Sequence, residues 1–80
     1  MNVRAYDNGG KTIDRYTAVF LDFPDHRPGT YFALGMSDQP FHPLGVGCST
    51  SAMPGRHLGR RVRIEDLPRD CQQLIAQVTP

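Results

Sequence analysis

The segment Asp7-Asn8-Gly9-Gly10 is the strongest local structural signal in this sequence. Asparagine and glycine adopt positive φ at low cost, and the tight connections of β-hairpins require positive φ. The flanking residues 3–6 and 11–22 are rich in β-branched and aromatic side chains, which favour strands. We therefore predict a β-hairpin that turns at residues 8–10.

The register of this hairpin depends on the length of its loop. A three-residue loop places Arg4 opposite Asp14 and Ala5 opposite Ile13, which pairs opposite charges and separates polar from apolar faces. A two-residue loop would place polar side chains opposite apolar ones. The sequence therefore favours the three-residue loop, with Arg15 interrupting an otherwise apolar face of the second strand.

A third strand and a long loop follow the hairpin. Phe32, Leu34 and Met36 alternate with smaller or polar residues within residues 30–36, which predicts a strand antiparallel to the second one. Residues 37–59 show no hydrophobic periodicity typical of a helix or a strand, because prolines and glycines recur at short intervals. We expect this long loop to be ordered and to lie on the sheet through its apolar residues, Phe41, Leu44, Val46, Met53 and Leu58.

The chain ends in a helical pattern, preceded at residues 61–64 by an alternating segment that predicts one more short strand. Proline is favoured in the first turn of a helix and keeps the residue before it out of the α conformation, so we expect the helix to start at Pro68. The residues at helical spacing form one apolar stripe: Leu67, Cys71, Leu74, Ile75 and Val78.

These elements predict an α+β fold in a single domain spanning residues 1–80. We expect an antiparallel sheet of three to four short strands with a long ordered loop and one C-terminal helix. The core of an 80-residue chain supplies a stabilisation free energy of roughly 3–5 kcal/mol, and a chain this short excludes a large nucleotide-binding domain or a two-lobed enzyme.

The longest apolar run, residues 18–21, is far shorter than a membrane span, so we expect a cytoplasmic protein without membrane contact.

Several residues resemble chemical motifs. Residues 5–12 match a relaxed phosphate-loop pattern, but that loop must lead into a helix, and residues 13–20 have strand character. His42, Cys48, His57 and Cys71 follow no zinc-site spacing, and Cys48 with either histidine lacks a third orienting group. We therefore expect no nucleotide hydrolysis, no catalytic residue, no metal and no cofactor. The two cysteines are too few for a disulfide framework, as in proteins of a reducing compartment.

Although the net charge of the chain is only +1, its sequence contains a local basic cluster. Four arginines lie within residues 56–63, which contain no acidic residue. Arginine binds phosphates and carboxylates, so we take as candidates for partner or phosphate binding the residues Arg56, His57, Arg60, Arg61 and Arg63, together with His42 and Phe41. The sequence pI of about 7.9 lies below that of typical nucleic-acid-binding domains, which makes a protein partner the first expectation.

Much of the chain resembles a group of small proteins of bacteria and their phages. The resemblance is carried by residues 6–12 (YDNGGKT) with 14–17 (DRYT), 40–46 (PFHPLGV), 57–61 (HLGRR) and 65–71 (EDLPRDC). It implies an origin in a phage or another mobile element and implies no activity. This chain differs at residues 48–52, where similar proteins often carry an aromatic residue. The resemblance also favours a structural role for Arg15, paired with Asp7, Asp22 or a loop carbonyl.

From the resemblance and the arginine cluster we expect a non-catalytic binding module that acts on a host protein. Its working surface would lie within residues 40–63, and a host-directed or counter-defence inhibitor is the specific form that a phage origin implies. The alternative is a nucleic-acid or nucleotide-phosphate binder that uses the arginines of residues 56–63. The sequence leaves the oligomeric state open, although a core this small favours a dimer on general grounds.

Overall fold

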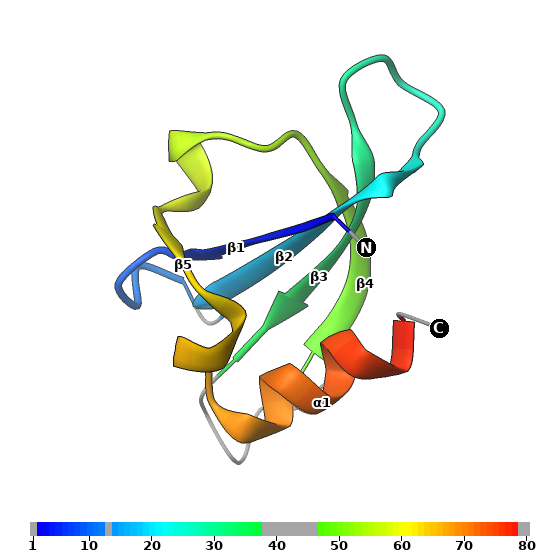
Figure 1. The fold of residues 1–80 in the computed structure, drawn as a ribbon. Coiled ribbons are helices and arrows are strands. Elements are labelled where there is room, and N and C mark those ends of the chain that lie inside the picture. The colour runs from blue at the N-terminus through cyan, green and yellow to red at the C-terminus, as the bar shows by residue number, and fades with distance from the viewer. Residues whose placement is uncertain (1, 13, 38–46, 79–80) are drawn as a thin grey trace.

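A computed structural model describes residues 2–12, 14–37 and 47–78, which form one antiparallel sheet and one C-terminal helix (Figure 1). The strands are β1 (Val3–Asp7), β2 (Tyr16–Pro24), β3 (Tyr31–Met36), β4 (Gly47–Ala52) and β5 (Arg60–Val62). Two 3-10 helices, η1 (Arg56–Leu58) and η2 (Ile64–Asp66), flank β5, and the α-helix α1 (Arg69–Val78) follows. The predicted α+β class is confirmed, and the sheet of 5 strands exceeds the expected number by one.

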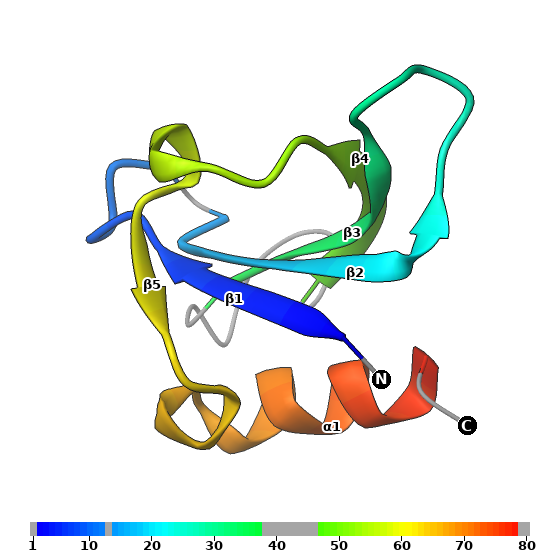
Figure 2. The ribbon, with the colours of Figure 1, turned by 45° about the horizontal axis from the view of Figure 1, so that its top comes forward.

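The strand order in the sheet is β4-β3-β2-β1-β5. Strands β1 to β4 therefore form a meander, and the chain then returns past η1 to place β5 beside β1. Among the described strands, β4 and β5 form the two edges of the sheet. The helix α1 covers one face of the sheet, and η1 lies on the opposite side (Figure 2).

The β1–β2 hairpin corrects the predicted register. Ala5 lies opposite Ala18 and Asp7 lies opposite Tyr16, so the connection runs from residue 8 to residue 15. Side chains hold this wide loop together, because Asp7 Oδ1 accepts a hydrogen bond from Gly9 N at 2.8 Å and Asn8 Oδ1 accepts one from Gly10 N at 2.8 Å. Since the register differs by an odd number of residues, the face of β2 that meets Ala5 is also reversed.

The long loop expected between β3 and β5 is shorter than predicted, because β4 and η1 lie within it. β4 pairs with β3 along its whole length, from Met36 opposite Gly47 to Tyr31 opposite Ala52. Its small, polar side chains at residues 49–51 are exposed at the edge of the sheet, so no hydrophobic alternation marks the strand. Of the expected apolar anchors, Leu58 packs on the core and Met53 is exposed, whereas Phe41, Leu44 and Val46 lie outside the described residues.

The core is divided between the two faces of the sheet. On the larger side, the apolar stripe of α1 packs as predicted: Leu67, Cys71 and Ile75 join a cluster that includes Phe20 and Met36. On the smaller side, the buried residues Tyr6, Val19 and Ala33 are covered in part by Leu58 of η1. Both faces of the central strand β2 are therefore buried, which fixes the sheet between η1 and α1.

The start of α1 also agrees with the sequence. The carbonyl of Pro68 accepts a hydrogen bond from Gln72 N at 3.1 Å, which places the proline in the first helical turn. Cys71 is buried and its thiol donates a weak hydrogen bond to the carbonyl of Ser37 at 3.9 Å, in line with its predicted role as a small core residue. Within the described part of the chain, no helix is both long and apolar enough to span a membrane.

Candidate binding site on strand β5

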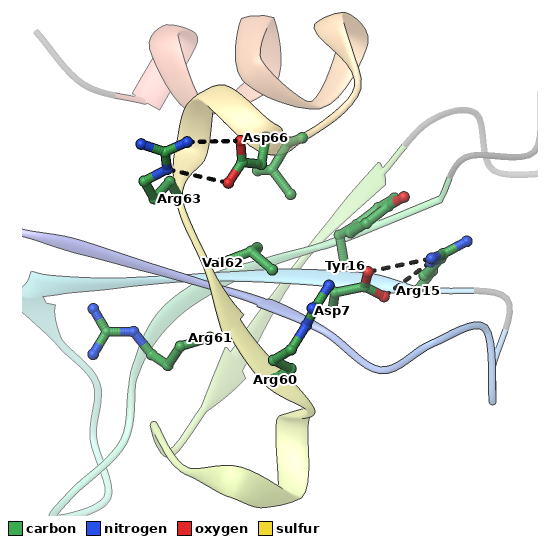
Figure 3. Close-up of a pocket in the computed structure, with 9 residues that line it drawn as sticks. Asp7, Arg15, Tyr16, Arg60, Arg61, Val62, Arg63 and Asp66 are labelled. Carbon is green, nitrogen blue, oxygen red and sulfur yellow. Dashed lines mark hydrogen bonds and ion pairs between the residues drawn. The ribbon is translucent and has the colours of Figure 1, made fainter.

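A concavity of about 550 Å³ opens beside β5, between the end of β1, the start of β2 and η2 (Figure 3). Four arginines and two aspartates supply its charged lining: Arg15, Arg60, Arg61, Arg63, Asp7 and Asp66. Its apolar surface comes from Tyr16, Val62 and Leu67. The side chain of Arg61 points to the other side of β5, so the remaining three arginines and two aspartates give this concavity a net charge of +1, although the whole chain is nearly neutral.

Asp7 and Arg15 form a two-point ion pair at one side of this concavity. Arg15 donates from Nε to Asp7 Oδ1 at 2.9 Å and from Nη2 to Asp7 Oδ2 at 3.2 Å. The hydrogen bond from Arg15 is the main reason that the pKa of Asp7 lies below its usual value of 3.8. The Arg15 guanidinium also lies 5.3 Å from the centroid of the Tyr16 ring, within cation–π range. Of the partners expected for Arg15, the structure shows Asp7, and this pair ties the wide loop to β1.

Arg63 and Asp66 form a second two-point pair at the other side. Arg63 donates from Nε and Nη2 to the two carboxylate oxygens of Asp66 at 3.2 and 3.3 Å. This pairing raises the pKa of Arg63 and lowers the pKa of Asp66. Both aspartates of the concavity therefore stay ionised near neutral pH, and each is already neutralised by its own arginine.

Arg60 and Arg61 differ from these paired arginines. Both are exposed, and no hydrogen bond or ion pair engages either side chain within the described part of the chain. Arg60 lies opposite Asp7 in the β1–β5 register and extends toward it, while Arg61 lies opposite Tyr6 and points to the other side of β5 (Figure 3). The positive charge of Arg60 helps to lower the pKa of both Asp7 and Asp66.

The structure divides the arginine cluster between the two faces of the sheet. A second concavity, of about 560 Å³, lies on the Tyr6 side and is lined in part by Arg56, Arg60 and Arg61. Alternation through residues 61–64 would place Arg61 and Arg63 on one strand face, but β5 ends at Val62, so Arg63 lies beyond the strand. The alternation stops there because the chain enters η2 at Ile64.

The remaining candidates are not brought to this site. His57 is exposed in η1 and lines a separate concavity near the β2–β3 hairpin. His42 and Phe41 lie outside the described residues. No group of three potential metal ligands occurs among the residues that the structure describes.

Sequence reasoning missed Asp7, Tyr16 and Asp66 as members of the site. In the sequence, Asp7 belongs to a predicted turn, and Asp66 is a charge near the start of the predicted helix. Asp7 and Tyr16 come close to Arg60 through the pairing of β5 with β1, which has no local sequence signal. Asp66 does have one, because it lies three residues after Arg63, the arginine with which it pairs.

The fold and this site define a small α+β protein with an arginine-lined edge strand. No known family model matches the chain, and neither a curated protein nor a solved structure is significantly similar to it.

Proposed function

We propose that this protein is a non-catalytic, cytoplasmic binding module of a phage or another mobile element, and that it binds an acidic surface of a host protein through β5. The observation that carries the proposal is the contrast among the arginines around β5. Arg15 and Arg63 each form a two-point pair with an aspartate, whereas Arg60 and Arg61 are exposed and form no hydrogen bond or close ion pair within the described residues. The aspartates near Arg60, Asp7 and Asp66, are already paired with Arg15 and Arg63. Carboxylates of a partner would supply the missing counter-charges.

The surroundings of Arg60 suit a protein contact. Val62, which is half-buried, lines the same concavity as Arg60, and arginine beside apolar surface is typical of residues that dominate protein interfaces. The Asp7–Arg15 pair holds one side of the concavity in place, which reduces the ordering cost of binding.

The distribution of acidic residues favours a protein over a nucleic acid. A phosphate backbone needs a continuous positive track, but Asp66, Glu65 and Asp70 follow the arginines directly. A discrete pair of carboxylates needs only Arg60 and Arg61, whereas a phosphate backbone would have to pass these acids as well. A host-directed or counter-defence inhibitor is the specific form of this proposal, and its support is the resemblance to small phage proteins.

The test is affinity capture from a bacterial host lysate, with and without nuclease. The bait proteins are the native chain, the double variant Arg60→Gln/Arg61→Gln, and the control Arg27→Gln, which removes an exposed arginine from the β2–β3 hairpin. We expect one host protein to be recovered in stoichiometric amount after nuclease treatment. The double variant should reduce its affinity roughly tenfold or more, as for loss of central interface arginines, and the control should not.

Two results would contradict the proposal. Recovery that disappears with nuclease assigns the site to a nucleic acid instead. Equal recovery by the native chain and the double variant, both folded by circular dichroism, excludes β5 as the binding surface. Higher salt should weaken the expected complex, because exposed charge pairs are screened.

A further inference from the structure

The hydrogen-bond pattern of β1 determines which main-chain groups of β5 face outward. Leu21 N donates to Asn2 O at 2.9 Å, and Asn8 N donates to Arg15 O at 2.9 Å. Main-chain groups of successive residues alternate between the two sides of an antiparallel strand. The even-numbered residues of β1 therefore face β2, and the odd-numbered residues Ala5 and Asp7 face β5.

The same alternation continues into β5. Ala5 lies opposite Val62 and Asp7 lies opposite Arg60, so these are the hydrogen-bonded pairs of the β1–β5 ladder. Arg61, which lies between them, directs its own N–H and C=O away from β1. Since β5 is the last strand in the sheet order, these two groups face the open edge.

The edge available for pairing is short and bounded. Gly59 N donates to Arg56 O at 3.0 Å, and Arg63 O accepts a hydrogen bond from Asp66 N at 3.0 Å. The 3-10 helices η1 and η2 thus use main-chain groups at both ends of β5. Arg61 is left at the centre of the exposed edge, with one donor and one acceptor side by side.

We propose that the outer edge of β5 binds an extended, acidic segment of the partner protein as an added strand, with the register set by Arg61. This inference rests on the proposed function, because it specifies how the partner is held. Addition of a strand to a sheet edge supplies main-chain hydrogen bonds, while side-chain pairs supply specificity. Here Arg60 and Arg61 project to opposite faces, so two consecutive acidic residues of the added strand would each meet one arginine.

The positive charge of β5 also indicates which kind of strand would pair with its outer edge. A second copy of this chain, paired antiparallel about the outward main-chain groups of Arg61, would place Arg61 opposite Arg61, and like charges directly opposite in a sheet are destabilising. The arginines therefore disfavour self-association at this edge and favour an acidic strand. An apolar residue next to the acidic pair would lie opposite Val62, which is half-buried and packs on the core.

The experiment uses the whole chain and the probe peptide acetyl-Thr-Val-Glu-Glu-Val-Thr-amide. Its core reads the same in both directions, so it offers the same pairs to β5 in either orientation. The first control peptide carries N-methyl groups on both glutamate nitrogens, which keeps the charge but removes the main-chain donors. The second control replaces both glutamates by lysine. Binding is followed by NMR titration and by hydrogen exchange of the Arg61 amide.

In the free protein, the Arg61 amide should exchange faster than the amides of Arg60 and Val62, because only Arg61 faces solvent. The acidic peptide should slow exchange at Arg61, and it should bind roughly tenfold more tightly than its N-methylated form, as expected for the loss of one or two hydrogen bonds. The lysine peptide should not bind. Arg61→Gln should weaken binding of the acidic peptide, whereas Arg27→Gln should leave it unchanged.

Failure of this inference can be separated from failure of the proposed function. If the N-methylated peptide binds as tightly as the acidic one and Arg61→Gln weakens both, strand addition is wrong but the arginine surface remains a binding site. If peptide binding does not respond to Arg61→Gln, strand addition at β5 is wrong, and the proposed function is then overturned only if the double variant Arg60→Gln/Arg61→Gln also captures the host protein as well as the native chain does. Tighter binding of a single-stranded oligothymidine than of the peptide would overturn the inference in favour of a nucleic acid.

Discussion

Gly59 shows how a single residue positions the candidate site. Its φ of 117° and ψ of −159° lie in a region that only glycine adopts readily. A Cβ atom at this position would lie 2.3 Å from the Asp7 carbonyl oxygen and 2.5 Å from its carbon. The absence of a side chain therefore lets the start of β5 touch the end of β1, which brings Arg60 beside Asp7.

Replacing Gly59 by alanine should lower the free energy of unfolding by about 3 kcal/mol or more, because backbone strain and a main-chain clash add. The matched control is Gly10→Ala. Gly10 also has positive φ, at 90°, but a Cβ atom there would meet nothing within 4 Å, so only about 1 kcal/mol of conformational cost is expected. Urea denaturation followed by circular dichroism measures both changes. Equal effects of the two variants would contradict the close approach of β5 to Asp7.

Asp7 makes stability depend on pH in a defined direction. Its pKa is lowered in the folded state, chiefly by the hydrogen bond from Arg15, relative to the usual value of 3.8. The resulting stabilisation is present above the unfolded pKa and is lost as the pH falls through the lower folded pKa. Asp7→Asn should therefore cost about 1–2 kcal/mol near neutral pH, and the difference from the native chain should shrink in strong acid.

Urea titrations near neutral pH and at about pH 2, below the usual carboxyl pKa, test this expectation. Asp22→Asn is the control, since Asp22 is exposed and accepts one hydrogen bond, from Asn2 N at 2.9 Å. An Asp7→Asn deficit that stays constant between the two pH values would show that packing, and not the ion pair, causes the loss.

At the scale of elements, α1 illustrates a structure that local sequence specifies well. Pro68 marks the first turn, and the spacing of Cys71 and Ile75 places both on the side that meets the sheet. The β1–β2 hairpin illustrates the opposite case. Turn-forming residues at Asn8 and Gly9 predicted a tight connection, but the side chains of Asp7 and Asn8 accept hydrogen bonds from the main chain of residues 9 and 11 and so stabilise a wider loop.

The packing of α1 on the sheet gives a direct stability prediction. Ile75→Ala should lower the free energy of unfolding by about 2–4 kcal/mol, because Ile75 is only 4% exposed and its truncation leaves a cavity. Gln73→Ala, an exposed change on the same helix, should alter it by about 0.5 kcal/mol or less. Thermal and urea melts compare the two variants. A small effect at Ile75 would mean that α1 contributes little to the core.

At the scale of the whole molecule, the site exists only because β5 returns beside β1. The Asp7–Arg15 pair belongs to the first hairpin, whereas Arg60, Arg63 and Asp66 come from the C-terminal third of the sequence. Both η1 and α1 are needed for this arrangement, since Leu58 covers one face of the sheet and Leu67 with Ile75 covers the other. The chain's near-neutral charge conceals the electropositive concavity that results.

Local signals in the sequence were enough to predict two of the elements. Alternation within residues 31–36 specifies β3, and helical spacing after Pro68 specifies α1, because both periods reflect one buried face. The four arginines were also visible as a cluster. The position of Arg60 and Arg61 on an edge strand next to β1 is seen only in the tertiary structure. The physical reason is that strand pairing depends on how α1 and η1 bury opposite faces of the sheet, which is a long-range property that no short segment encodes.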